Sequence, residues 1–186
     1  MCISQERIIL GYRRGPNLRD LIVRVKLAPV NPTIPRDNVP CASPRTCRYC
    51  PVIDTSGHIT STTTGKKHIT KTNVRCTTNN FIYCIECTHC KLQYVGQTKN
   101  SIKVRFHKHF DNITSGRSDH IIGQHFNSIG HHKILDVRIY VLEFMRTPPD
   151  MSPESLRARL KIESTWIHRL RTTSPLGLNI ADTQSW

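Results

Sequence analysis

The chain has 186 residues, of which 37% are hydrophobic and 22% charged, a composition typical of a globular protein with little apolar mass for its length. Its 27 Lys and Arg outnumber its 13 Asp and Glu and leave a formal net charge of +14, which favours a polyanionic partner, above all nucleic acid. Because no run of about eighteen apolar residues occurs, we expect no membrane-spanning helix and no membrane partner.

The first 40 residues are expected to form a basic extension that contains no packed core. Proline favours extended or irregular chain, and this stretch contains Pro16, Pro29, Pro32, Pro35 and Pro40. Only residues 18–27 have a pattern suited to a short helix or strand. Charged residues interrupt any signal-peptide core at the start of the chain: Arg7, Arg13, Arg14, Arg19 and Asp20. We therefore expect a reducing compartment, where cysteines bind metal more readily than they form disulfides.

Residues 41–80 are polar and threonine-rich, with few large hydrophobic side chains to hold them folded. A closed zinc site contributes on the order of 10 kcal/mol to folding, so a metal is the expected source of order in this segment. A Cys-x-x-Cys pair and two further cysteines predict an all-cysteine zinc site: Cys41, Cys47, Cys50 and Cys76. His58 and His68 are alternatives to the first and the last of these ligands.

Residues 81–87 and 92–98 are rich in aromatic and β-branched side chains and predict a β-hairpin. The connection between them carries Cys87 and Cys90, whose spacing suits one tetrahedral zinc ion. Two histidines of the later HFNSIGHH segment would complete the site: His125 with either His131 or His132. Cys84, within the first strand, is expected to be a small buried residue.

Two helices are expected after the hairpin. In the segment 101–113, Ile102, Phe106 and Phe110 recur at helical spacing and would form one buried stripe. Residues 118–130 predict a second, shorter helix.

Residues 135–144 predict a third strand, and the final helix has the clearest signal of all. Ser152 is a good N-cap and Pro153 suits the first helical position. Apolar residues then recur until the helix ends near Thr172: Leu156, Leu160, Ile167 and Leu170. The order β, β, α, α, β, α predicts an α/β (α+β) fold for residues 81–186, with a small mixed sheet flanked by helices and a zinc-bound N-terminal extension.

Two tripeptides on the predicted hairpin carry a family resemblance. FIY (81–83) and YVG (94–96) resemble the two elements that name the GIY-YIG nuclease family, with Phe81 where the family has its first glycine. Arg105 and His109 follow at positions i and i+4, so they lie on one side of the next helix, where the family has an Arg and often a His. Two later residues resemble the family's metal-binding glutamate and its late asparagine: Glu163 and Asn179.

The pattern is more similar still to the Penelope-like retroelement branch of this family. In that branch a cysteine pair lies between the two tyrosine motifs, two histidines come later, and the chain closes with Glu-x-x-Trp-Ile and Pro-x-Gly-Leu-Asn. Both closing segments occur here, the first as Glu163, Trp166 and Ile167 and the second at residues 175–179. The resemblance covers residues 81–180, where it also implies a GIY-YIG-type fold.

The resemblance implies a metal-dependent DNA endonuclease. Glu163 would hold one divalent ion, Mg²⁺ or Mn²⁺, that polarises the scissile phosphate. Tyr83 would be the general base, although a phenol with a pKa of about 10 costs roughly 4 kcal/mol to ionise at neutral pH. Arg105 would favour the phenolate and neutralise charge on the phosphate. The remaining roles would be water orientation by Tyr94, proton relay by His109, with His120 as a further candidate, and bracing of the metal site by Asn179.

Two functions from different classes follow. In the first, the chain nicks DNA in the nucleus, and in a retroelement the nick supplies a 3′ hydroxyl that primes reverse transcription, with a reverse transcriptase or element RNA as a further partner. In the second, it is a zinc-dependent nucleic-acid-binding module derived from a retroelement and lacking turnover. The residues before Phe81 are too few for a reverse transcriptase, so we expect a truncated element product or a captured gene.

Overall fold

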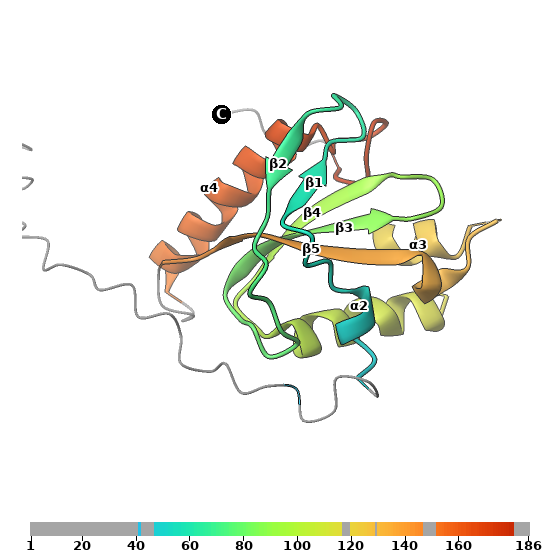
Figure 1. The fold of residues 1–186 in the computed structure, drawn as a ribbon, viewed down its shortest axis with the longest axis horizontal. Helices are drawn as coiled ribbons and strands as arrows, with labels where there is room; N and C mark the ends of the chain where they lie inside the picture. Colours follow the sequence, from blue (N-terminus) through green and yellow to red (C-terminus); the bar gives the residue numbers. More distant parts are fainter. Residues whose placement is uncertain (1–40, 42–46, 117–119, 129, 147–151, 181–186) are drawn as a thin grey trace, which may run out of the picture. The chain divides into compact units, whose positions relative to one another are not determined.

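The computed structural model describes most of the chain from residue 41 onward (Figure 1), namely residues 41, 47–116, 120–128, 130–146 and 152–180. The expected extension at residues 1–40 lies outside these ranges. The described residues all belong to one compact unit, so the described part of 41–80 packs with the module that begins at Phe81. No helix within the described ranges is long and apolar enough to cross a membrane.

A three-stranded antiparallel sheet forms the centre of this unit, with the strand order β4-β3-β5. Its strands are β3 (Phe81–Cys87), β4 (Gln93–Thr98) and β5 (Val137–Phe144). β3 and β4 form the expected hairpin, in which Tyr83 pairs with Gly96, and β5 is the expected third strand. Six of the seven β3 residues are buried, which requires a layer of structure on each face of the sheet.

Both expected middle helices pack on one face of the sheet, α2 (Ile102–Thr114) and α3 (Ile121–Phe126). The Ser101 hydroxyl accepts a hydrogen bond from the Val104 N–H at 3.3 Å and caps α2. The predicted stripe of α2 is fully buried and meets the β3 side chains of that face: Ile102, Phe106 and Phe110. Short 3-10 turns, η1 (Cys50–Val52) and η2 (Lys133–Asp136), flank this layer.

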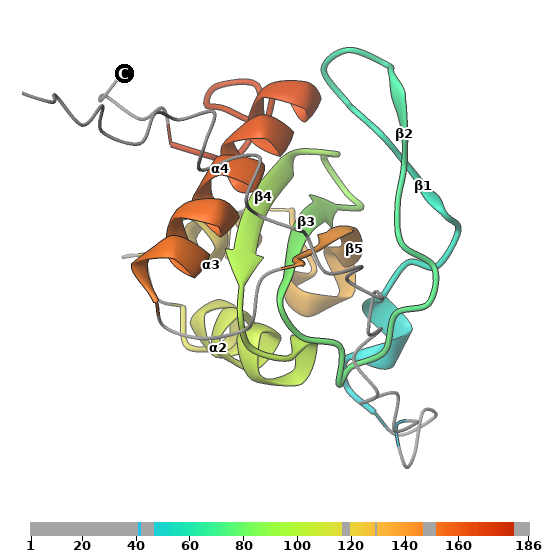
Figure 2. The same ribbon diagram turned by 90° about the vertical axis from the view of Figure 1, so that its left-hand side faces the viewer.

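The other face is covered partly by the last helix, α4 (Pro153–Leu170), which lies alongside β4 in Figure 2. Ser152 caps it as expected, since its hydroxyl accepts from the Ser155 N–H at 3.2 Å. The buried face of α4 differs from the expected one, because Leu156 and Leu160 are 43% and 46% exposed. Leu170 is buried as expected, and the other buried side chains of α4 are Ser155, Arg159 and Trp166.

A second, two-stranded hairpin completes this face, formed by β1 (His58–Thr60) and β2 (Lys67–Ile69). The sequence did not predict it, because its strands are three residues long and Ile59 is their one buried residue. Ile59 packs with Trp166 and Leu170 of α4 in the smaller core. The same segment covers the free edge of β5, where the Lys71 N–H donates to the Val141 carbonyl at 2.8 Å.

The fold class is therefore the expected α/β one, with the small central sheet flanked by helices. Both sheets of the described chain are antiparallel throughout. The larger core joins β3 to α2 and α3, and it includes side chains from the cysteine-rich segment such as Tyr49, Ile53 and Cys76.

Candidate active site and metal centres

The Tyr83 hydroxyl lies at the centre of a buried polar cluster. It accepts a hydrogen bond from Nε of Arg105 at 2.9 Å and lies 2.9 Å from Nε2 of His109. Arg105 and His109 are one turn apart on α2, so both side chains reach across the sheet face to the same oxygen. The structure therefore brings together three of the residues selected from the sequence.

Gly96, directly across from Tyr83 on β4, leaves the space that the phenol occupies. A Cβ atom at Gly96 would lie 2.6 Å from the Tyr83 hydroxyl and 2.9 Å from Cε1 of Tyr94. Such contacts are well inside van der Waals distance, so any larger residue would displace one of the two rings. The last glycine of the YVG tripeptide thus has a steric role in the site, which its position in the sequence could have suggested.

The charge of Glu163, on α4, acts on the hydroxyl groups of Tyr83 and Tyr94. Burial raises the pKa of Tyr83, Arg105 lowers it, and the charges of Tyr94 and Glu163 add to the rise. Burial likewise raises the pKa of Tyr94, with a further contribution from Glu163. The charge of Glu163 thus acts on both tyrosines, whose ring centroids are 6.4 Å apart.

His109 is neutral in this environment. Burial, with the charges of Arg105 and His120, lowers its pKa to about 3. The Tyr83 O–H can then donate to Nε2, which places the remaining imidazole proton on Nδ1. That Nδ1 is buried and has no hydrogen-bond partner among the described residues.

An open pocket of about 490 Å³ lies beside this cluster on α2. Its lining includes Arg105, Lys108, His109 and His120, so its walls are mainly basic and polar. The His109 and His120 ring centroids are 6.0 Å apart, which brings the further candidate His120 to the same place.

Asn179 braces β4, and its side-chain hydrogen bonds within the described chain go to Val95 and Thr172. Its Oδ1 accepts from the Val95 N–H at 2.8 Å and from the Thr172 hydroxyl at 2.7 Å. Its Nδ2 donates to the Val95 carbonyl at 2.8 Å. The carboxamide thus pairs with both backbone groups of Val95, as a neighbouring strand would, and it reaches the site only through the strand that carries Tyr94.

The first predicted zinc set is assembled around the β3–β4 turn. The ligand atoms of its four residues all lie within 4.8 Å of one another: Cys87, Cys90, His125 and His131. Sγ of Cys90 is 3.4 Å from Nε2 of His125. The alternative ligand His132 points elsewhere, 74% exposed and 3.8 Å from the Asp136 carboxylate.

The His131 ring is held in the form that binds a metal. The Ser128 hydroxyl donates to the His125 carbonyl at 2.7 Å, so its oxygen accepts from Nδ1 of His131 at 2.9 Å. Nε2 of His131 then carries a lone pair, and it is buried without a hydrogen-bond partner in the described chain. Such an orphaned nitrogen facing two cysteines and a histidine fits a zinc ion. Ser128 had no sequence signal beyond its place between the two histidines.

The second predicted set, in the cysteine-rich segment, is assembled as well. The four thiols lie within the same 4.8 Å limit: Cys41, Cys47, Cys50 and Cys76. Although burial opposes ionisation, hydrogen bonds from the backbone and from the neighbouring thiols lower the pKa of Cys47 to about 7. The alternatives are engaged elsewhere, since His58 bonds the Ser56 carbonyl and His68 makes an edge-to-face contact with Trp166.

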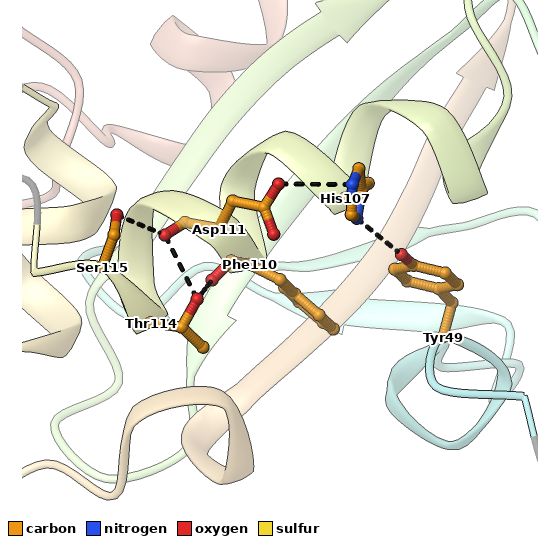
Figure 3. A network of polar contacts seen from close by, with 6 residues as sticks. All are labelled: Tyr49, His107, Phe110, Asp111, Thr114 and Ser115. Carbon is orange, nitrogen blue, oxygen red and sulfur yellow. Dashed lines mark hydrogen bonds and ion pairs between the residues drawn. The ribbon is translucent and has the colours of Figure 1, made fainter.

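This cysteine cluster is attached to the helix that carries Arg105 and His109. The Tyr49 hydroxyl lies 3.4 Å from Nδ1 of His107, whose Nε2 lies 3.3 Å from the Asp111 carboxylate, as Figure 3 shows. The Tyr49 ring also packs on Phe110, with centroids 5.5 Å apart. A metal bound at the four thiols would therefore stabilise the position of α2.

The chain is similar to known catalytic domains. The family model of the GIY-YIG catalytic domain matches residues 79–174, just over half of the chain. Among solved structures, the catalytic domain of the homing endonuclease I-TevI is similar, with 26% sequence identity and a TM-score of 0.44 over 56% of this chain and 100% of that one. No curated protein matches significantly. On the family-model match, the chain belongs to the GIY-YIG family.

Proposed function

We propose that the chain is a metal-dependent DNA endonuclease that hydrolyses phosphodiester bonds. The observation that carries this proposal is the hydrogen bond from the Arg105 guanidinium to the Tyr83 phenol, with the charge of the Glu163 carboxylate acting on both groups. Membership of the GIY-YIG family supports the reaction class. The formal net charge of +14 supports a nucleic-acid substrate.

Glu163 is the residue that would hold the divalent ion, Mg²⁺ or Mn²⁺. Its side chain is half-buried and its charge reaches both tyrosines. One carboxylate fits this task, because Mg²⁺ at phosphate-processing sites takes one or two carboxylates and completes its shell with phosphate oxygens and water. When bound, the ion would polarise the scissile phosphate and stabilise the leaving oxygen.

Tyr83 is the proposed general base. Because burial raises its pKa, a standing phenolate is unfavourable despite Arg105. Instead, Tyr83 would take a proton from the attacking water while it passes its own proton to Nε2 of His109, 2.9 Å away. The water oxygen bonds to phosphorus, the bond to the 3′ oxygen breaks, and that oxygen takes a proton from solvent. The charge of the bound phosphate would raise the pKa of His109 and so help it to accept the proton.

The other site residues would support this step. Arg105 neutralises charge that develops on the phosphate and holds the Tyr83 oxygen in place. Tyr94, which is partly exposed, would orient the attacking water. Asn179 would act as a positioning residue, since it fixes the backbone of β4 at Val95.

The two cysteine-containing clusters are the proposed sites of structural Zn²⁺. Four ligands each from Cys and His match the closed tetrahedral sites that zinc forms in small domains. Neither cluster contains the Tyr83 hydroxyl or Glu163, so both metals would stabilise the fold and take no part in the reaction.

For the biological setting, we propose a Penelope-like retroelement origin and a nuclear location. The support is the combination of the Cys87 and Cys90 pair inside the hairpin with the closing segments at Glu163 and at residues 175–179. In that setting the nick would prime reverse transcription, and a reverse transcriptase or element RNA would be a further partner. Residues 81–186 would be the endonuclease domain, residues 41–80 its zinc-bound support, and residues 1–40 a basic extension.

The alternative is a nucleic-acid-binding module without turnover. It has a specific observation in its favour: the catalytic phenol, Tyr83, is fully buried in the unbound chain. The test is plasmid nicking with Mg²⁺ by the wild type and by Glu163→Ala, together with DNA affinity measured on both. Nicking that is lost in Glu163→Ala while binding persists supports the endonuclease. DNA binding by both proteins with nicking by neither supports the alternative.

A further inference from the structure

A group of exposed cations lies away from the Tyr83 cluster, where the tip of the β1–β2 hairpin meets the end of α4. The four residues, here called the hairpin–helix patch, are Lys66, Lys67, Arg169 and Arg171. The hairpin tip and the end of α4 lie side by side in both Figure 1 and Figure 2. Residues 79–174 match the family model, so the hairpin precedes the matched part of the chain.

Hydrogen bonds and contacts with the Trp166 ring fix the hairpin to the helix. The Ser61 hydroxyl donates to the Leu170 carbonyl at 2.8 Å, and the Thr63 hydroxyl donates to the Arg171 carbonyl at 3.3 Å. His68 of the hairpin and Arg169 of the helix both pack on the Trp166 ring. The His68 ring centroid lies 5.8 Å from the Trp166 centroid, and Cζ of Arg169 lies 5.1 Å from it. The cations of the two elements are therefore held on one surface.

None of the four patch cations forms an ion pair among the described residues, and the Glu143 carboxylate near Trp166 accepts a hydrogen bond from that ring. The segments that form the patch, residues 57–71 and 164–180, contain no Asp or Glu. The ion pairs found among the described residues involve other side chains. Clustered cations without counter-charges repel one another, and a polyanion relieves that repulsion while releasing its own condensed counterions.

The position of the patch relative to Glu163 suggests how it would be used. Arg169 follows Glu163 by six residues, which corresponds to about 9 Å along the helix axis, and Arg171 caps the end of the helix just beyond it. This distance equals roughly three base pairs of duplex DNA, which rises 3.4 Å per step. A duplex whose scissile phosphate lies at Glu163 can thus present backbone phosphates to the patch.

We propose that the hairpin–helix patch binds the phosphate backbone of duplex DNA beside the cleavage site. The proposal rests on the proposed endonuclease function. Sites for single-stranded nucleic acid present exposed aromatic rings for base stacking, whereas Trp166 is 6% exposed and already covered by His68 and Arg169. A surface of cations alone fits the regular backbone of a duplex.

The test is the salt dependence of DNA binding by the full chain, with Glu163→Gln in all proteins so that the probe is not cut. The probe is a fluorescent 30-base-pair duplex, and fluorescence anisotropy gives Kd at several NaCl concentrations. The double variant Lys67→Gln/Arg171→Gln should bind every duplex more weakly. Its plot of log affinity against log salt should be less steep by about 1.8, since each lost phosphate contact reduces the steepness by about 0.9. Lys133→Gln/Arg138→Gln, which removes two cations at η2 and β5, should keep the wild-type slope.

Equal slopes for the patch variant and the control would overturn the proposal. A loss confined to a single-stranded RNA probe, with duplex binding unchanged, would overturn it too. Nicking by the protein with Glu163 restored separates this proposal from the endonuclease itself, because it tests the reaction without reference to the patch. If the wild type fails to nick while the patch still sets the slope, the endonuclease proposal fails and the binding surface stands. If nicking occurs and the slopes are equal, the binding surface alone fails.

Discussion

Gly96 shows how a single residue can determine whether the site exists. Replacing it by Ala places a methyl group 2.6 Å from the Tyr83 hydroxyl, so one of the tyrosine rings must move. We expect Gly96→Ala to lose about 1 to 3 kcal/mol of unfolding free energy, as overpacked cores do, and to lose nicking activity. Urea unfolding and plasmid nicking measure the two effects.

The control for Gly96→Ala is Gly116→Ala. A Cβ at Gly116 meets no atom within 4 Å, although its φ of +66° makes Ala mildly unfavourable there. The control should therefore nick DNA normally. A Gly96→Ala protein that nicks as fast as the wild type would contradict the assigned role of Gly96.

His109 gives the fold a specific acid sensitivity. Burial, Arg105 and His120 lower its folded pKa to about 3, whereas an unfolded His has a pKa of about 6.5. As the pH falls below 6.5 the unfolded chain binds a proton that the folded chain does not, so stability present at neutral pH is lost. Between pH 7 and pH 5 this loss is about 2 kcal/mol.

His109→Gln removes that titration and keeps a hydrogen-bonding group near Tyr83. The unfolding free energy of the variant should therefore fall by about 2 kcal/mol less than that of the wild type between pH 7 and pH 5. Urea unfolding at the two pH values tests this. Parallel pH dependences for the two proteins would mean that His109 is not held neutral.

At the scale of elements, the cysteine and histidine clusters take the place of missing apolar core. His131→Ala and His132→Ala form a matched pair, because the first residue faces the ligand cluster and the second is exposed. Native mass spectrometry should find two zinc ions on the wild type and on His132→Ala, and one on His131→Ala. We also expect His131→Ala alone to lower the melting temperature, because zinc binding contributes directly to folding. Equal zinc loss in both variants would contradict the assignment.

Elements with strong local signals were predictable, and those that depend on tertiary contacts were not. The β3–β4 hairpin, the α2 stripe and the Ser152 cap were predicted correctly. The β1–β2 hairpin was missed, because Ile59 gives it no periodic pattern. The buried face of α4 was predicted wrongly at Leu156 and Leu160, because the helix turns Arg159 and Trp166 toward the sheet. For the site, residue types and spacing selected the side chains, but the engagement of Asn179 with Val95 needed the fold.

At the scale of the whole molecule, the fold brings together side chains from distant parts of the chain. Tyr83 comes from the central strand β3, and Arg105 and His109 come from helix α2. Glu163 comes from helix α4, which packs beside β4. The cysteine-rich segment and the C-terminal segment then cover the two sheet edges. The reaction proposed for this chain requires that whole arrangement, and its centre is the Tyr83 hydroxyl.

The single-turnover nicking rate of Tyr83→Phe at saturating enzyme and Mg²⁺ is the most direct test of this account. The variant keeps the ring that fills the space beside Gly96 and removes only the oxygen that Arg105 and His109 contact. We predict DNA affinity close to that of the wild type and a rate lower by about 10² to 10⁴, the usual contribution of general acid–base catalysis. A Tyr83→Phe protein that cuts DNA at the wild-type rate would contradict it.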